Sequence, residues 1–180
     1  MGYYSQLIKR KFKDVVGKRY EDVMREYGEF LLSEEQMMAP EVKSILMPLD
    51  IFVREIPDAL YEVLSAFTAP VSLVYITDIQ TVSVIETVLD KKAREEYLRK
   101  KESHGNELLD RVAHELNAKG LVSHRRIYTG QKGEDVEKLC ETHDLLLLSK
   151  SYGAERTEGY PVSPLALRIS QHVKIPLIFY

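Results

Sequence analysis

Histidine and cysteine, the side chains that most often carry metal or covalent chemistry, are few and scattered in this sequence. There are five histidines and one cysteine, Cys140. No histidine has a second histidine or a cysteine at the short spacing that zinc ligands need, so the pattern predicts no zinc site. The histidines are His104, His114, His124, His143 and His172. Cys140 falls on the inner face of an expected helix, which indicates a small buried hydrophobic residue rather than a nucleophile.

The motifs that position a nucleophile or a phosphate are incomplete. The sequence has no Gly-x-Ser-x-Gly segment, which would place a serine on a sharp turn between a strand and a helix. The segment Gly130-Gln-Lys-Gly133 is rich in glycine but lacks the full spacing of a phosphate-binding loop. A turn between a strand and a helix explains it. We therefore expect no catalytic residues and predict that the protein is not an enzyme.

Composition narrows the class of protein further. The net charge of −3 and the pI near 6.0 argue against general nucleic-acid binding. No stretch approaches the ~18 apolar residues of a membrane span. A single cysteine excludes a disulfide within the chain and favours a reducing, cytoplasmic location. With 180 residues, of which 44% are hydrophobic, the chain suits one domain and an appendage.

Strands and helices are expected to alternate from residue 44 onward. The apolar runs predict strands at 44–50, 71–78, 121–129, 145–148 and 175–180. Helical spacing of apolar residues predicts helices at 56–67, 134–143 and 164–172, and over much of the long charged stretch after residue 78. Continuous apolar strands joined by helices imply a parallel sheet covered on both faces, with right-handed crossovers.

Several segments, in this order, resemble the universal stress protein family. They are Ile45–Asp50 with its Pro-x-Asp ending, Pro70–Asp78, Gly130–Leu148 and Lys174–Phe179. The resemblance implies a doubly wound α/β fold whose five parallel strands have the order 3-2-1-4-5. It also implies a homodimer, often made by pairing the final strands, here Ile175–Tyr180. We accordingly divide the chain into a helical extension and linker, residues 1–42, and an α/β domain, residues 43–180.

Many members of this family bind ATP through a Gly-x-x-Gly-(nine residues)-Gly-Ser/Thr signature after the fourth strand. In the best register, Lys150, Gly153, Ser163 and Pro164 occupy the four positions, so only the second position keeps its glycine. Proline has no N–H, so the helix start at Pro164 loses one donor for a phosphate. Ser163 and Pro164 instead predict a simple helix start, with serine as the cap and proline as the first helical residue.

The resemblance also implies a crevice in which a ligand would lie. Its candidate residues are Asp50, Ile76, Lys150, Gly153 and Ser163. Asp50 occupies the position that contacts the adenine or ribose region, and Lys150 offers a compensating charge. The leading hypothesis is a dimeric, non-catalytic binding or regulatory protein with a degenerate ATP-binding loop. The alternative is a protein that binds ATP or another adenine nucleotide, with slow hydrolysis or none.

Residues 7–31 form a separate amphipathic pattern. Apolar side chains recur there at steps of three and four, which predicts one continuous helix with a basic first half. The simplest interpretation is packing on its own domain or on a partner subunit. A third functional hypothesis is that this helix docks another protein. Contact with anionic lipid is less favoured, because Glu21, Asp22, Glu26 and Glu29 offset the basic half.

Overall fold

The computed structural model of the chain describes residues 41–155, 157, 159 and 161–180. The helix predicted for residues 7–31 lies outside the described residues. The hypothesis that this helix docks another protein therefore stays untested. The division of the chain after residue 42 therefore stays a prediction.

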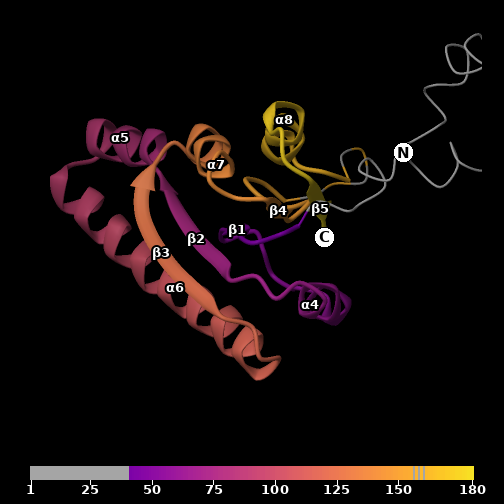
Figure 1. Ribbon diagram of the computed structural model, residues 1–180. Coiled ribbons are helices and arrows are strands. Elements are labelled where there is room, and N and C mark those ends of the chain that lie inside the picture. The colour runs from indigo at the N-terminus through magenta and orange to yellow at the C-terminus, as the bar shows by residue number, and fades with distance from the viewer. Residues whose placement is uncertain (1–40, 156, 158, 160) are drawn as a thin grey trace, which may run out of the picture. The chain divides into compact units, whose positions relative to one another are not determined.

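The described chain is built on one parallel sheet of five strands. They are β1 (Ile45–Leu49), β2 (Val71–Asp78), β3 (Ser123–Gly130), β4 (Leu145–Leu148) and β5 (Leu177–Phe179). All four strand pairings are parallel, and the order across the sheet is β3-β2-β1-β4-β5 (Figure 1). Both the fold class and the strand order predicted from the sequence are confirmed.

The two strands β1 and β4 lie inside the sheet, where helices cover both faces, and this accounts for their apolar sequences. Every residue of β1 and of β4 is buried, as expected for continuous apolar runs in a parallel sheet. β3 and β5 form the two edges. β3 exposes His124, Arg125 and Arg126, whereas all three residues of β5 are apolar and half-buried. An apolar edge strand needs covering, and the homodimer expected through it stays a prediction.

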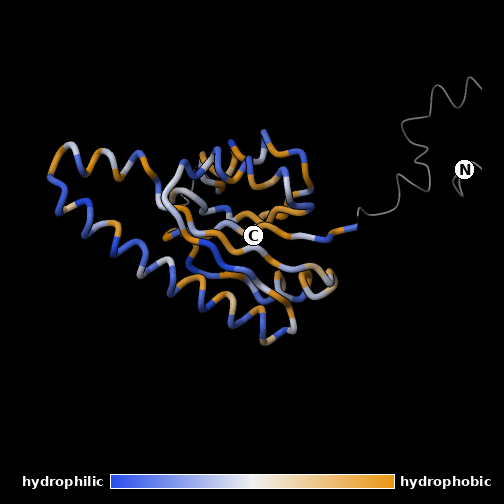
Figure 2. The backbone as a smooth tube through the Cα atoms, turned by 60° about the vertical axis from the view of Figure 1, so that its left-hand side comes forward, coloured by the Kyte–Doolittle hydropathy of each residue, from blue (hydrophilic) through white to orange (hydrophobic). Residues whose placement is uncertain are grey.

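Helices cover both faces of the sheet. They are α4 (Asp58–Ser65), α5 (Ile79–Val88), α6 (Lys91–Ala118), α7 (Lys132–Cys140) and α8 (Pro164–His172). α4 and α6 enclose one apolar core and α7 and α8 enclose the other (Figure 1). In Figure 2, hydrophilic residues make up much of the long helix α6, and hydrophobic positions recur between them.

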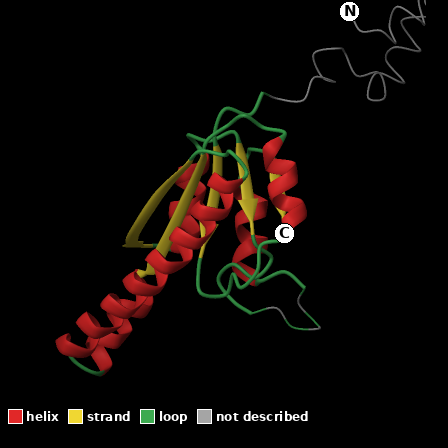
Figure 3. Cartoon of the chain, turned by 90° about the horizontal axis from the view of Figure 1, so that it is seen from below, coloured by secondary structure: helices red, strands yellow, loops and turns green. Residues whose placement is uncertain are grey.

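The long charged stretch after residue 78, predicted to be helical over much of its length, forms the two helices α5 and α6. Asp78 caps α5 by accepting a hydrogen bond from the Gln80 N–H at 3.0 Å, and Asp90 caps α6 by accepting one from the Ala93 N–H at 2.6 Å. The α5–α6 hairpin and the loop between β4 and α8 project beyond the same end of the sheet (Figure 3). This hairpin brings the first half of α6 beside the carboxyl ends of the strands.

Cys140 is buried at the end of α7, as its position in the sequence predicts. Burial, with a smaller contribution from the Glu137 carboxylate, raises the pKa of its thiol to about 12. The thiol therefore stays protonated at neutral pH. No helix of the described residues is long and apolar enough to cross a membrane.

Candidate ligand-binding site

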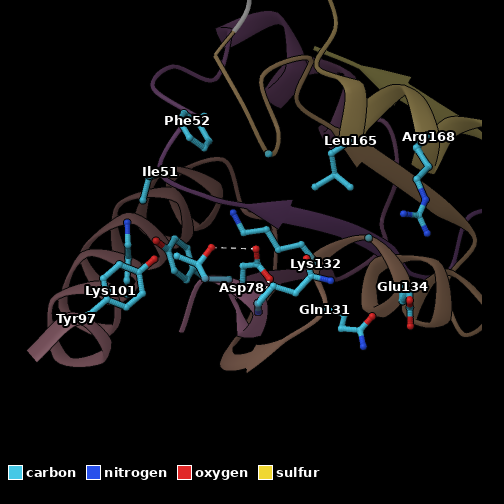
Figure 4. A pocket seen from close by; sticks show the side chains of 15 residues that line it. Ile51, Phe52, Asp78, Tyr97, Lys101, Gln131, Lys132, Glu134, Leu165 and Arg168 are labelled. Carbon is cyan, nitrogen blue, oxygen red and sulfur yellow. Dashed lines mark hydrogen bonds between the residues drawn. The ribbon is translucent and has the colours of Figure 1, made fainter. Parts of the chain in front are cut away.

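The carboxyl ends of parallel strands meet at one edge of the sheet, where doubly wound folds bind their ligands. In this chain a hollow of about 440 Å³ opens there (Figure 4). Its walls come from the segments after β1, β2, β3 and β4, from the first half of α6 and from α8. Three aromatic residues, Phe52, Tyr75 and Tyr97, line it together with Lys101, Lys132 and Arg168. The hollow thus combines cationic groups with flat apolar surfaces.

Asp50, directly after β1, is fully buried behind this hollow. Its Oδ1 accepts a hydrogen bond from the Phe52 N–H at 3.0 Å. Its Oδ2 accepts one from the Gly153 N–H at 2.7 Å and one from Lys132 Nζ at 3.0 Å. A buried carboxylate is stable only when it is paired and hydrogen-bonded. The protein itself therefore supplies all the partners that Asp50 has in the described structure.

Lys132 is the site residue that the sequence analysis missed. The segment 130–133 was predicted to be a turn, but α7 begins at Lys132, and the side chain of that residue reaches Asp50 across 82 positions of the chain. The Lys132 side chain is only 17% exposed. Its Nζ lies 5.7 Å from the centre of the Tyr152 ring and 6.0 Å from that of Phe52, distances at which a cation is attracted to an aromatic face. The sequence signal that could have identified it is a lysine just after the third parallel strand, at the edge of the sheet where Asp50 also lies.

Tyr152 fills the space between the loop after β4 and the sheet. It is 0% exposed and packs in one apolar cluster with Ile76, Val136 and Leu148. Burial, reinforced by the Asp50 carboxylate, raises the pKa of its phenol well above the ordinary value. The hydroxyl is therefore protonated, yet it finds no hydrogen-bond partner among the described residues.

The peptide N–H groups of the loop after β4 are hydrogen-bonded within the protein. Every peptide N–H from Lys150 to Ala154 donates a hydrogen bond within the chain. The acceptors, in chain order, are Tyr180 O, Ser149 Oγ, Ser149 O, Asp50 Oδ2 and Ser151 O, at 2.9, 3.2, 3.0, 2.7 and 3.2 Å. A phosphate bound by a loop of this kind needs free N–H groups that point toward it. The segment from Lys150 to Ala154 has no free peptide N–H group for a phosphate.

Ser163, at the start of α8, is also hydrogen-bonded within the protein. Ser163 is fully buried, and its Oγ accepts a hydrogen bond from the Ala166 N–H at 3.0 Å while donating to the Tyr152 carbonyl oxygen. Its N–H donates to Lys150 O at 2.7 Å. Pro164 follows as the first helical residue. Ser163 and Pro164 thus form the simple helix start that their order predicts.

The structure places the five predicted crevice residues in three different settings. Asp50 and Gly153 are joined by a hydrogen bond, and Gly153 lines the hollow. Ile76 is 0% exposed in the apolar cluster that also contains Tyr152, and Ser163 is buried as the cap of α8. Lys150 lines a different hollow, beside Tyr180.

Comparison with solved structures identifies the architecture. A universal stress protein from Lactobacillus plantarum superposes with a TM-score of 0.62, at 15% identity, over 78% of this chain and 99% of that one. The fold is that of the universal stress proteins. A protein of the universal stress family from Burkholderia pseudomallei gives a TM-score of 0.56 at 16% identity, over 79% of this chain and 98% of that one. A universal stress protein in complex with cAMP gives 0.50 at 11% identity, over 78% and 97%. No protein-family model and no curated protein sequence matches the chain.

Gly153, which falls at the second position of the signature that the resemblance implies, has a geometry that requires glycine. Its φ is +90°, and a Cβ there would lie 2.6 Å from Leu165 Cδ2 and 2.8 Å from Leu165 Cβ. We expect Gly153→Ala to lower the free energy of unfolding by about 2–4 kcal/mol, through backbone strain and the clash together. Chemical denaturation measures this loss.

Gly120→Ala is the matched control for this substitution. Gly120 also has a positive φ, +78°, but a Cβ there would meet nothing within 4 Å. Only the backbone part of the cost, about 1–2 kcal/mol, is expected. Equal losses in the two variants would contradict the close approach of Leu165 to Gly153.

Proposed function

We propose that this chain is a non-catalytic binding protein of the universal stress family in which the ATP-binding loop is closed by the protein's own groups. The observation that carries the proposal is the hydrogen bonding of the loop after β4. All five peptide N–H groups from Lys150 to Ala154 have acceptors within the chain. Binding a triphosphate on this loop would require breaking several of these bonds, each with a net value of about 1 kcal/mol.

The side chains of Tyr152 and Lys132, which lie between the β4 loop and the sheet, also support the proposal. The ring of Tyr152 is fully buried in the same apolar cluster as Ile76, the residue that the family resemblance assigns to the nucleotide crevice. The ammonium group of Lys132 pairs with Asp50, the carboxylate assigned to the adenine or ribose region. A nucleotide bound in the family manner would have to displace both an aromatic ring and a buried ion pair.

The same contacts favour binding over catalysis. A carboxylate that acts as a general base must reach the proton that it removes. Both oxygens of Asp50 are instead occupied by hydrogen bonds from Phe52, Gly153 and Lys132, and its side chain is 1% exposed. We therefore assign Asp50 a structural role, holding the segments after β1, β3 and β4 together.

An adenine nucleotide is the second candidate ligand. It is favoured by the solved universal stress protein of the same fold that is in complex with cAMP. In this chain such a ligand would have to use the hollow lined by Phe52 and Tyr97 rather than the loop after β4.

Isothermal titration of the full chain with Mg-ATP, AMP and cAMP tests the proposal. We expect no ATP binding tighter than about 1 µM, which corresponds to about −8 kcal/mol. Incubation with Mg-ATP is expected to release no phosphate above the rate without protein. Sub-micromolar ATP binding, or phosphate release that depends on the protein, would show that the loop opens and would overturn the proposal.

A further inference from the structure

The edge strand β3 presents a row of peptide groups that point away from the sheet. Its residues pair with those of β2 one to one, in a single register along the whole strand. At the start of this ladder the Val71 N–H donates to Val122 O at 2.9 Å. Because alternate residues of a parallel strand bond to the same neighbour, the even-numbered residues of β3 bond to β2 and the odd-numbered ones face outward. The outward peptide groups in the middle and at the end of β3 are those of Arg125, Ile127 and Thr129.

These outward peptide groups have no hydrogen-bond partner within the described part of the chain. Such a row is a template for another strand, and proteins commonly blunt it by a short edge, a proline, a bulge or charged side chains. β5, the other edge, has three residues, whereas β3 has eight and contains no proline. Charged side chains are therefore the main feature that decides which strand can pair with β3.

A hollow of about 390 Å³ lies beside this edge, between β3 and the helix α6 that runs along it (Figure 1). Leu109 of α6 and Ile127 of β3 give it an apolar part. When a peptide adds to a sheet edge, its main chain supplies affinity and hollows for alternate side chains supply specificity. We call this hollow the β3 groove; its lining residues are Asn106, Leu109, Asp110, Arg125, Arg126 and Ile127.

The β3 groove has an excess of basic side chains. Arg125 and Arg126 line it against one acid among the described residues, Asp110, which pairs with Arg125. Arg126 has no ion-pair partner within the described part of the chain, and its guanidinium lies 4.7 Å from the centre of the Tyr128 ring. The Asp135 carboxylate, whose charge also reaches Tyr128, is already held by a peptide N–H at the start of α7 and by a lysine of that helix.

The same charges select between two kinds of partner strand. A second copy of β3 paired about Arg125 or Arg126 would place arginine against arginine, and like charges opposite each other destabilise a strand pair. An acidic strand would instead place carboxylates against them. The two faces of the edge also differ: Ile127 packs on the α6 side of the sheet and Tyr128 on the α7 side. A strand that alternates acidic and apolar residues matches both faces.

We propose that β3 binds an extended acidic segment of another protein, which joins the sheet as an added strand. Its acidic side chains lie on the face of Arg126, and its apolar side chains point into the β3 groove toward Leu109 and Ile127. The inference goes beyond the proposed function and does not depend on it. The β3 groove shares no lining residue with the hollow at the carboxyl edge and is separate from the β4 loop.

Fluorescence anisotropy of a labelled peptide, Glu-Val-Glu-Val-Glu-Val-Glu, titrated with the full chain tests the choice of partner. We expect binding, and we expect the peptide with lysine in place of glutamate to bind about tenfold more weakly or worse. Arg126→Met should weaken binding of the glutamate peptide about threefold or more, because it removes a charge from the edge. Arg99→Met is the matched control, since Arg99 is exposed on α6 but does not line the β3 groove. It should leave the affinity unchanged.

A proline at Thr129 tests the main-chain pairing. The Thr129 N–H faces away from β2, so Thr129→Pro removes no hydrogen bond of the existing ladder. It does remove a donor that the added strand needs, and we expect the peptide to bind about fivefold more weakly or worse. Thr129→Val keeps the N–H and is expected to bind as the unsubstituted chain does. Thermal denaturation checks that the proline variant remains folded.

Amide hydrogen exchange of the unsubstituted chain, followed by NMR, gives a readout that requires no substitution. Bound peptide should slow exchange at Arg125, Ile127 and Thr129, and change little at the even-numbered residues that already bond to β2. Absence of glutamate-peptide binding at millimolar concentration, equal affinity for the lysine peptide, or binding that leaves these three amides unprotected would overturn the proposal. Protection that grows with protein concentration in the absence of peptide would identify a second copy as the partner, and would contradict it as well.

Discussion

Replacing Lys132 by methionine is expected to lower the free energy of unfolding by about 3–5 kcal/mol. The substitution leaves the Asp50 carboxylate, whose side chain is 1% exposed, without its cation. A buried charge that loses its partner keeps its full desolvation cost, whereas the methionine side chain adds little. Urea or guanidinium denaturation, monitored by circular dichroism, measures the change in midpoint.

Lys138→Met controls for the loss of a lysine from the same helix. Lys138 is 69% exposed and lies 3.9 Å from Asp135, so its ion pair is screened by water and a loss of no more than about 0.5 kcal/mol is expected. In the double variant Asp50→Asn with Lys132→Met, the total loss should be smaller than the sum of the two single losses, because the charges are removed together. Additive losses, or similar stabilities for Lys132→Met and Lys138→Met, would mean that the ion pair contributes little to the fold.

The sequence predicts the elements well where local chemistry and tertiary burial agree. The strands at 71–78 and 145–148 and the helix at 164–172 have the predicted bounds. In the helix, the Ser163 cap and Pro164 define the start regardless of what packs against it. β5 is shorter than predicted and starts at Leu177. Pro176 lacks an N–H and contributes only its carbonyl oxygen, which accepts from Leu146 N–H at 3.0 Å.

The site is predicted only in part, because its decisive contacts join distant segments. Asp50 and Gly153 can be placed at one edge from the order of the strands, and the structure joins them by a hydrogen bond. The pairing of Lys132 with Asp50 depends on where α7 begins and on how its first turn lies over the sheet. Neither is encoded in the glycines of segment 130–133, which suggested a turn. A periodicity argument therefore finds the scaffold but not the cation that neutralises its central acid.

Tyr152 offers the second large effect, in which two substitutions at one position are expected to act in opposite directions. Tyr152→Ala should cost about 3–5 kcal/mol, because it empties a fully buried aromatic site between the β4 loop and the sheet. Tyr152→Phe should instead stabilise the protein by about 1 kcal/mol, because it removes a buried hydroxyl that has no partner among the described residues.

The control for the hydroxyl is Tyr61→Phe. Tyr61 is equally buried, at 2% exposure, but its hydroxyl donates to the Glu115 carboxylate, so the same chemical change should cost about 1 kcal/mol or more. Thermal and chemical denaturation of the three variants shows directly whether each substitution raises or lowers the free energy of unfolding. A loss of stability in Tyr152→Phe would show that the Tyr152 hydroxyl is hydrogen-bonded. The β4 loop would then hold a polar group or a water at the point where this structure has only the phenol, and the closed crevice would have a different interior from the one described.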